Sequence, residues 1–251
     1  MSTPGGPSLR AMTFNIRHGN GLDQRVDLAR TAGVIRAARP DVVGLQEVDR
    51  HFGDRSGFLD QAQWLAAALS MHLAYGANLD LDPPAAGRPR RQFGNALLSR
   101  HPVLDSENFL LPRTGGNEQR GLLRGQIEAG GRHWQVYITH LQPNDPGERL
   151  AQAHAVAGRI GAPDHPLILL ADLNATPGMP EVQALTGGLV DAWPTAGSWC
   201  GNTFPTPFPY RRIDYVLHSG TCRAQAASVV GSLPARIASD HLAVVADIAP
   251  L

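Results

Sequence analysis

The chain has 251 residues, of which 43% are hydrophobic and 18% are charged. These proportions exclude a largely disordered protein, because the chain can bury enough apolar surface to offset the entropy cost of ordering. Lysine and arginine total 22, as do aspartate and glutamate, so the formal net charge is zero and argues against a protein that coats nucleic-acid phosphates.

No segment has the features of a membrane or secretory protein. The start, MSTPGGPSLR, lacks a basic stretch followed by an apolar one, and no apolar run reaches the length that spans a bilayer. We therefore expect a cytoplasmic monomer with a flexible segment at residues 1–8 and, since no linker splits the rest, a single domain at residues 9–251. Cys200 and Cys222 are too few for a disulfide framework, and we interpret both as free thiols, although one bridge between them would be possible.

The first hundred residues alternate between strand and helix patterns. Residues 9–14 predict a strand, residues 26–38 a helix that ends before Pro40, and residues 41–46 a buried strand. A second helix is expected over residues 59–69. The segment 82–92, rich in proline, glycine and arginine, predicts an exposed and mobile loop ahead of the apolar residues 95–98.

The remainder of the chain is richer in strands. Strands are predicted at 103–110, 122–128 and 134–139, with a hairpin turn at Gly130 and Gly131. A helix at 149–160 and a buried strand at 166–171 follow, and then three strands at 213–217, 226–230 and 243–248. Hairpins in some places and crossover helices in others indicate mixed sheets packed together with helices outside.

Polar residues suited to binding metals or phosphates border six of the predicted strands. They are Asn15, Glu47, His140, the pair Asp172 and Asn174, Asp214, and the pair Asp240 and His241. At strand spacing Asp172 and Asn174 face the same way, so that together they could hold a nucleophilic water. The alternative is a turn in which both side chains bond back to the backbone.

Glu47 ends an apolar strand, where a charge needs a partner or access to solvent. With no thiolate nearby, carboxylate and amide oxygens favour Mg²⁺ or Mn²⁺ over Zn²⁺, whereas a solvated carboxylate would need no metal. Asp240 and His241 are adjacent and point apart, which favours Asp240 toward a metal or water and His241 toward a phosphate. Asp214 would orient His241, or would instead pair with Arg211 or Arg212.

Together these segments resemble the endonuclease/exonuclease/phosphatase superfamily. The resemblance rests on seven motifs in order: TFNIR, LQEVD, GNALLSRHPV, THL, ADLNATP, RRIDYVL and SDHLAV. It implies a four-layer α/β/β/α sandwich of two packed mixed sheets. Ala171 and Ala243 depart from the glycine and the proline that the family often has in its GD-x-N and SDH-x-P motifs, but neither change removes a functional group.

The resemblance also implies a role for each residue. Glu47 would be the principal ligand of one or two Mg²⁺ or Mn²⁺ ions, Asn15 would lie close to the metal, and Asp240 would complete the metal or water shell. The other roles concern water and phosphate: Asp172 and Asn174 would handle the attacking water, His140 and His241 would contact the phosphoryl oxygens, Asp214 would orient His241, and Asn95 and Arg212 would bind substrate.

The expected activity is metal-dependent hydrolysis of a phosphodiester or phosphomonoester, on a small-molecule or phospholipid-type substrate, by in-line attack of water. One alternative is a DNA or RNA nuclease, for which Arg88, Arg90, Arg91, Arg120 and Arg124 could form a local basic rim. A second is a catalytically silent binding protein.

The aromatic segment 198–210 leaves two interpretations open. It contains Trp199, Phe204, Phe208 and Tyr210, interspersed with glycine and prolines. These side chains would either form a hydrophobic wall over the site or cap the core.

Overall fold

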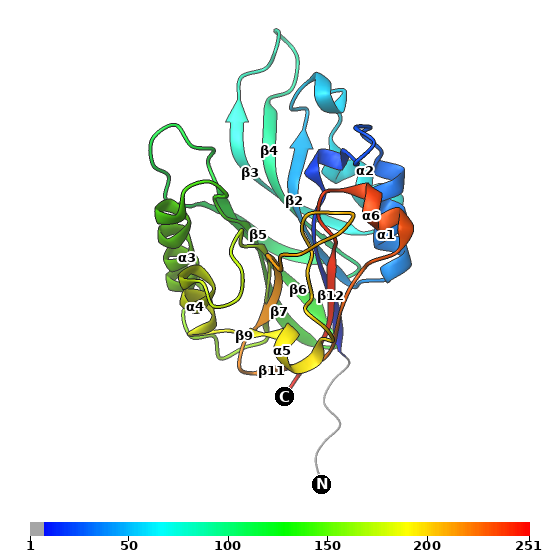
Figure 1. Cartoon of the computed structure of the whole chain (residues 1–251). Helices are drawn as coiled ribbons and strands as arrows, with labels where there is room; N and C mark the ends of the chain where they lie inside the picture. Colours follow the sequence, from blue (N-terminus) through cyan, green and yellow to red (C-terminus); the bar gives the residue numbers. More distant parts are fainter. Residues whose placement is uncertain (1–7) are drawn as a thin grey trace.

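In the computed structural model, which describes residues 8–251, two six-stranded sheets pack face to face (Figure 1). Apart from Ser8, the predicted flexible segment lies outside the described residues. The first sheet has the order β11 (Cys222–Val229), β12 (Val244–Pro250), β1 (Leu9–Asn15), β2 (Val42–Arg50), β4 (Arg91–Ser99) and β3 (His72–Leu81). The second sheet has the order β5 (Val103–Leu110), β6 (Gly121–Ala129), β7 (Arg132–His140), β8 (Leu167–Asp172), β10 (Asp214–His218) and β9 (Val190–Asp191).

Helices cover the outer face of each sheet. Figure 1 shows α1 (Leu28–Ala38), α2 (Gln61–Leu69) and α6 (Leu233–Ala238) on one side, and α3 (Pro146–Ile160) and α4 (Pro180–Thr186) on the other. The short α5 (Ala192–Ala196) lies against β11, and the 3₁₀ helices η1 (Arg17–Gly19) and η2 (Asp54–Ser56) follow β1 and β2. This arrangement is the expected four-layer sandwich.

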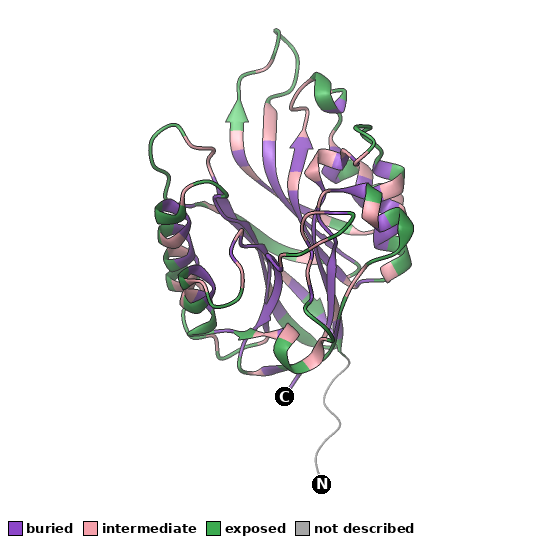
Figure 2. Cartoon of the chain, viewed as in Figure 1, coloured by how far each residue is buried: buried purple, intermediate pink, exposed green. Residues whose placement is uncertain are grey.

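Three apolar clusters hold the layers together. Trp134 and Leu170 of the second sheet pack with Leu97 of the first sheet between the two sheets. The outer faces pack on helices: Leu45 with the α1 and α2 side chains, and Leu169 with those of α3 and α4. Figure 2 accordingly shows buried residues concentrated in the strands and exposed ones on the outer helix surfaces and loops.

Gly44 of β2 allows the sheets to approach closely. A Cβ atom at this position would lie 2.7 Å from Cβ of Leu170 and 2.9 Å from Cγ1 of Ile138, both on the second sheet. These distances are shorter than a carbon–carbon contact allows. Only glycine therefore fits between β2 and the facing strands without a shift.

Each sheet contains one parallel pair. Strands β1 and β2 run parallel with α1 as their crossover, and β7 and β8 run parallel with α3 as theirs, while the other pairings are antiparallel. The predicted hairpin between β6 and β7 is present, and both of its glycines have positive φ, as a two-residue type I′ turn requires. The sheets are mixed, as expected.

Several boundaries differ from the predicted ones. The strand predicted at 41–46 continues to Arg50, and the loop predicted at 82–92 is shorter because Arg91 and Gln92 already belong to β4. The helix predicted at 149–160 begins at Pro146, one residue after Asp145, whose carboxylate accepts a hydrogen bond from the Glu148 amide. The predictions omitted β3, β9, α4, α5 and α6.

Two composition-based expectations can be compared with the structure directly. Cys200 is exposed, Cys222 is buried, and both are free thiols, as interpreted from the sequence. Among residues 8–251, no helix combines the length and the apolar character needed to cross a membrane.

Candidate active site

Three of the predicted site residues occupy one row across the second sheet. His140 on β7 is the register partner of Asp172 on β8, and Asp172 is the register partner of Asp214 on β10. Two residues on the side of the first sheet meet this row: Asn15, which ends β1, and His241, which lies in the loop between α6 and β12. The site therefore lies where strand ends of both sheets meet.

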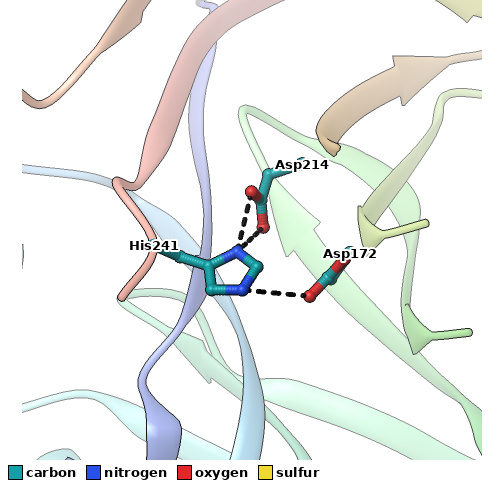
Figure 3. A group of neighbouring side chains, drawn as sticks. All are labelled: Asp172, Asp214 and His241. Carbon is teal, nitrogen blue, oxygen red and sulfur yellow. Dashed lines mark hydrogen bonds and ion pairs between the residues drawn. The ribbon is translucent and has the colours of Figure 1, made fainter. Parts of the chain in front are cut away.

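His241 lies between two carboxylates (Figure 3). Its Nδ1 is 3.0 Å from Oδ2 of Asp214, and its Nε2 is 3.7 Å from Oδ2 of Asp172. Burial alone would lower the pKa of His241, but the two carboxylates outweigh it and raise the pKa to about 10. His241 is thus a cation at neutral pH. The contact expected between Asp214 and His241 is present, whereas Arg212 pairs with another carboxylate.

Asp172 is the hub of the cluster. Its Oδ2 accepts a hydrogen bond from Asn15 Nδ2 at 2.9 Å and lies 3.4 Å from Nε2 of His140. Complete burial raises the pKa of Asp172 to about 7, although the nearby His241 cation opposes this rise. A carboxyl with such a pKa can exchange a proton with water near neutral pH.

The turn after β8 contains Asp172 and Asn174, for which the sequence left two interpretations open: a pair of side chains facing a water, or a local turn. The Asn174 amide N–H donates to Oδ1 of Asp172 at 3.0 Å, which is the local turn that the sequence left open. The Asn174 side chain donates to the Leu141 carbonyl at 3.0 Å and lies equally close to Nε2 of His140. Its φ of 50° is a left-handed value that asparagine tolerates. Asn174 thereby packs against His140.

Arg120 determines which nitrogen of His140 carries a proton. Its NH1 group lies 2.9 Å from Nδ1 of His140, and both side chains are buried. A guanidinium can only donate, so Nδ1 must accept, and we assign the proton of the neutral ring to Nε2. The 3.0 Å contact between Nε2 and Asn174 Nδ2 then joins two donors and is not a hydrogen bond, because Nδ2 donates to the Leu141 carbonyl. Burial first, and then the Arg120 and His241 charges, hold the pKa of His140 well below its usual value. His140 is therefore a neutral donor facing Asp172.

Glu47 reaches the site from a β-bulge in β2. Gln46 and Glu47 together face the single residue Asn95 on β4, and Glu47 has a φ of 58°. A bulge redirects a side chain that strict alternation would place elsewhere. The Glu47 carboxylate accepts a hydrogen bond from Asn15 at 3.1 Å, and no arginine among the described residues lies within ion-pair distance of it. Burial raises its pKa.

The donor set around Glu47 fits a hard cation. A partly buried carboxylate whose hydrogen-bond partner is an amide is poorly compensated, and Asp240, whose charge also acts on Glu47, adds a second carboxylate. The ligand atoms of Asp172, Asp214 and His241, all within 4.8 Å of one another, form another group that could hold an ion. However, each ring nitrogen of His241 already faces a carboxylate, Asp214 at 3.0 Å and Asp172 at 3.7 Å, so the side of the site near Glu47 suits a metal better.

Comparison with known proteins agrees with this arrangement. The sequence profile of the Endonuclease/Exonuclease/phosphatase family matches residues 12–241. The chain belongs to this family. Family membership makes a hydrolase of phosphate esters the general expectation, and divalent metals are the usual cofactors of the group.

Relatives align over nearly the whole chain. The protein YbhP of Escherichia coli K12 is 29% identical, and the alignment covers 96% of both chains. A solved family member from Beutenbergia cavernae DSM 12333 is 31% identical, with a TM-score of 0.80 over 97% of this chain and 72% of that one. A mannosyl-6-phosphatase of Bacteroides thetaiotaomicron has a TM-score of 0.75 at 19% identity, covering 96% and 99%, and shows a shared fold.

Two residues assigned to substrate make other contacts in this family member. Asn95 is buried and donates from its amide to the Gly121 carbonyl at 3.1 Å, which ties the first sheet to the second. Arg212 is buried, donates to Asp191 at 2.7 Å and stacks over the ring of Tyr215. A substrate contact for either residue stays a prediction, and Arg212 in particular is already engaged.

Two residues near the Asp172 cluster were not assigned to the candidate site from the sequence. Arg120 was grouped only with a basic rim, and the ring of Phe204 lies 4.8 Å from that of His241, centroid to centroid. The loop that carries Phe204 is bonded to the His241 loop, because Thr206 donates to the carbonyls of Ser239 and Asp240. The aromatic composition of segment 198–210 was the only signal for Phe204, and Arg120 had none beyond its charge.

Proposed function

We propose that the chain is a divalent-metal-dependent hydrolase of phosphate esters, acting on a small-molecule or phospholipid-type diester or monoester. The observation that supports this most is the environment of Asp172, a carboxyl with a pKa of about 7 between a cationic and a neutral histidine. These groups can accept a proton from water and donate hydrogen bonds to a phosphate at the same place.

The side chains divide the chemistry between them. Asp172 accepts the proton of the attacking water. His241, held as a cation by Asp214, and His140, through its Nε2–H, donate to the phosphoryl oxygens as negative charge grows there. Because Asp172 lies on the second sheet and His241 on the loop that leads into β12 of the first sheet, the packing of the sheets sets the distance between the proton acceptor and this donor.

A metal would be held on the Glu47 side of the site. Glu47 would be the main ligand, with Asp240 and the side-chain oxygen of Asn15 beside it, and one ion or two would fit this proposal. A bound Mg²⁺ or Mn²⁺ would neutralise phosphoryl charge. Oxygen donors without thiolates support these hard cations over zinc.

The charge distribution supports a small substrate over a polynucleotide. Of the five arginines that could form a basic rim, Arg90 is paired with Asp80 and Asp82, and Arg124 with Asp105. Arg120 is directed at His140. Few free cations therefore remain to follow a phosphate backbone. A silent binding protein is disfavoured because the predicted residues converge on one site instead of scattering.

A substrate panel tests the proposed function. Purified protein with Mg²⁺ or Mn²⁺ is expected to cleave bis-p-nitrophenyl phosphate or p-nitrophenyl phosphate, and the panel adds DNA, RNA, inositol phosphates, phospholipids and mannose 6-phosphate. Asp172→Asn and His241→Gln should each lower kcat by roughly a thousandfold. His218→Gln is the matched control, because His218 is a buried histidine of β10 outside the cluster.

Folded wild-type protein that turns over no substrate with either metal would contradict the proposal. Loss of activity in His218→Gln equal to that in His241→Gln would contradict the site assignment. We further propose that the protein is a single-domain monomer that acts in the cytoplasm. Sedimentation checks the monomer, and cell fractionation checks the location.

A further inference from the structure

An exposed apolar patch lies beside the active-site loop. Trp199 is 95% exposed, Phe208 83%, Leu233 79% and Tyr210 71%. Apart from the C-terminal Leu251, these are the four most exposed large apolar side chains of the described residues. We call them the apolar patch. Trp199 and Phe208 line one cavity, Leu233 begins the helix whose Arg236 lines the same cavity, and Tyr210 follows Phe208 by two residues. Single exposed apolar residues are ordinary on protein surfaces, but a group that borders one cavity indicates an interaction site.

We propose that the apolar patch docks the protein on the surface of an anionic phospholipid bilayer. Tryptophan and tyrosine prefer the boundary between headgroups and acyl chains, since each combines an apolar ring with a polar group. Phenylalanine and leucine add apolar area that can enter this boundary. The aromatic segment thus does not cap the core: Phe204 contacts His241, and the other three rings of the segment are exposed.

The patch is held in place by backbone contacts. Trp193 donates from its indole to the Trp199 carbonyl at 3.2 Å, and the amides of Tyr210 and Arg211 donate to the Phe204 carbonyl. Arg236 of α6 donates to the Pro207 carbonyl, which joins the helix that begins at Leu233 to the aromatic loop. The exposed rings are therefore presented by an ordered scaffold, which lowers the entropy cost of inserting them.

A cavity of about 550 Å³ lies at the patch. Trp199 and Phe208 line this cavity together with Arg236. Arg236 is the charged residue of the lining, and no carboxylate of the described residues lines the cavity. The Arg236 side chain donates hydrogen bonds to the carbonyls of Gly231 and Pro207. An uncompensated guanidinium among exposed rings suits a lipid phosphate above an apolar layer.

The patch is continuous with the active site through the loop. Thr206 lies between Phe204 and Phe208 in sequence and bonds to Ser239 and Asp240, which precede His241. If the proposed hydrolase function holds, docking would bring lipid headgroups near His241. Docking itself is independent of hydrolysis, so the two proposals can fail separately.

Vesicle binding tests the docking proposal. Co-sedimentation is measured with vesicles of phosphatidylcholine and phosphatidylglycerol and with vesicles of phosphatidylcholine alone. We expect wild-type protein to bind the anionic vesicles more tightly and its tryptophan emission to shift to the blue. Trp199→Ser and Phe208→Ser should each weaken binding roughly tenfold, as loss of one inserted ring implies. Arg236→Gln should remove most of the preference for anionic vesicles.

Controls separate docking from folding and catalysis. Leu110→Ser removes an exposed leucine from the edge strand β5 of the second sheet and should leave vesicle binding unchanged. Trp199→Ser and Phe208→Ser should keep the wild-type melting temperature and the wild-type rate on a soluble chromogenic ester. Absence of vesicle binding by wild type would overturn the proposal, as would equal losses in Leu110→Ser. So would a dimer in sedimentation analysis that Trp199→Ser and Phe208→Ser dissociate, because the patch would then join two copies of the chain.

Discussion

At the scale of single residues, the partner of His140 is the finding with the clearest consequence. Removing Arg120 in Arg120→Met takes away the donor at Nδ1 and a nearby cation, so the pKa of His140 should rise toward its usual value of about 6.5. The expected result is a loss of kcat of roughly tenfold or more, with acid inhibition that sets in at a higher pH than in the wild type.

Two measurements check the role of Arg120. The pH profile of kcat should shift in Arg120→Met, and the NMR titration of the His140 ring should show the raised pKa. Arg120→Lys, which keeps a cationic donor, should recover part of the rate. A lower kcat with an unchanged pH profile and an unchanged titration would show that Arg120 merely supports the fold.

Glu47 gives a prediction for metal removal. Because burial raises its pKa, the metal-free protein should lose stability as the pH rises through the pKa of this carboxyl, and Glu47→Gln should be free of that loss. Mg²⁺ at about 100 times its Kd should stabilise the wild type by about 2.7 kcal/mol and leave the variant unchanged. Thermal and denaturant unfolding in EDTA and in Mg²⁺ measure this, and equal stabilisation of both proteins would exclude Glu47 as a ligand.

The sequence could predict the identities of the site residues better than their partners. Asp172 and Asn174 were expected to share a face, yet a bulge, a local turn and a left-handed residue set the real geometry of Glu47 and Asn174. The Arg120–His140 and Arg212–Asp191 contacts join residues that are 20 and 21 positions apart in the chain. Such pairs depend on tertiary packing, and a single sequence contains no signal for them.

At the scale of elements, helix α3 tests the signals that set a helix boundary. Asp145 accepts the Glu148 amide and Pro146 follows at the first helical position, which together are a start signal that the prediction of 149–160 overlooked. Asp145→Ala should lower the free energy of unfolding by about 1 kcal/mol. Asp164→Ala, in the exposed loop before β8, is the control and should change it little, and denaturant unfolding that ranks the two variants alike would contradict the capping role.

The elements that the sequence did not predict lack the residue pattern that marks a strand or a helix. Strand β3, HLAYGANLDL, carries glycine, asparagine and aspartate where apolar residues would mark a strand, and its buried residues Ala74, Gly76 and Asn78 lie on the face that packs against the second sheet. Helices α5 and α6 have five and six residues, too few for a helical period to emerge. Long apolar runs such as β8 were predictable because their pattern depends on burial alone.

At the scale of the whole molecule, the spacing of the two sheets holds the site together. Gly44→Ala would place a methyl group 2.7 Å from Leu170, and we expect a loss of about 1–3 kcal/mol in unfolding free energy, measured by denaturant titration. Gly33→Ala, in α1 with open space around it, should instead be neutral or stabilising by up to about 1 kcal/mol. Equal effects of the two changes would contradict the close approach at Gly44.

The four-layer order followed from the mixture of hairpins and crossovers, together with the family resemblance. The assembly of the site did not follow from them, because His241 lies in the loop before β12 of the first sheet, 27 positions from Asp214 on the second sheet. Only the packed sandwich brings His241 against Asp172 and Asp214, with ligand atoms of all three within 4.8 Å of one another, so the site exists at this scale alone.

Crystals of the wild-type protein soaked in Mn²⁺ and inorganic phosphate give the most direct test of a shared metal and phosphate site. We predict an anomalous difference peak at bonding distance from the Glu47 carboxylate, with the phosphate within hydrogen-bond distance of His140 and His241. A Mn²⁺ peak away from Glu47, or a phosphate that contacts neither histidine, would contradict the account.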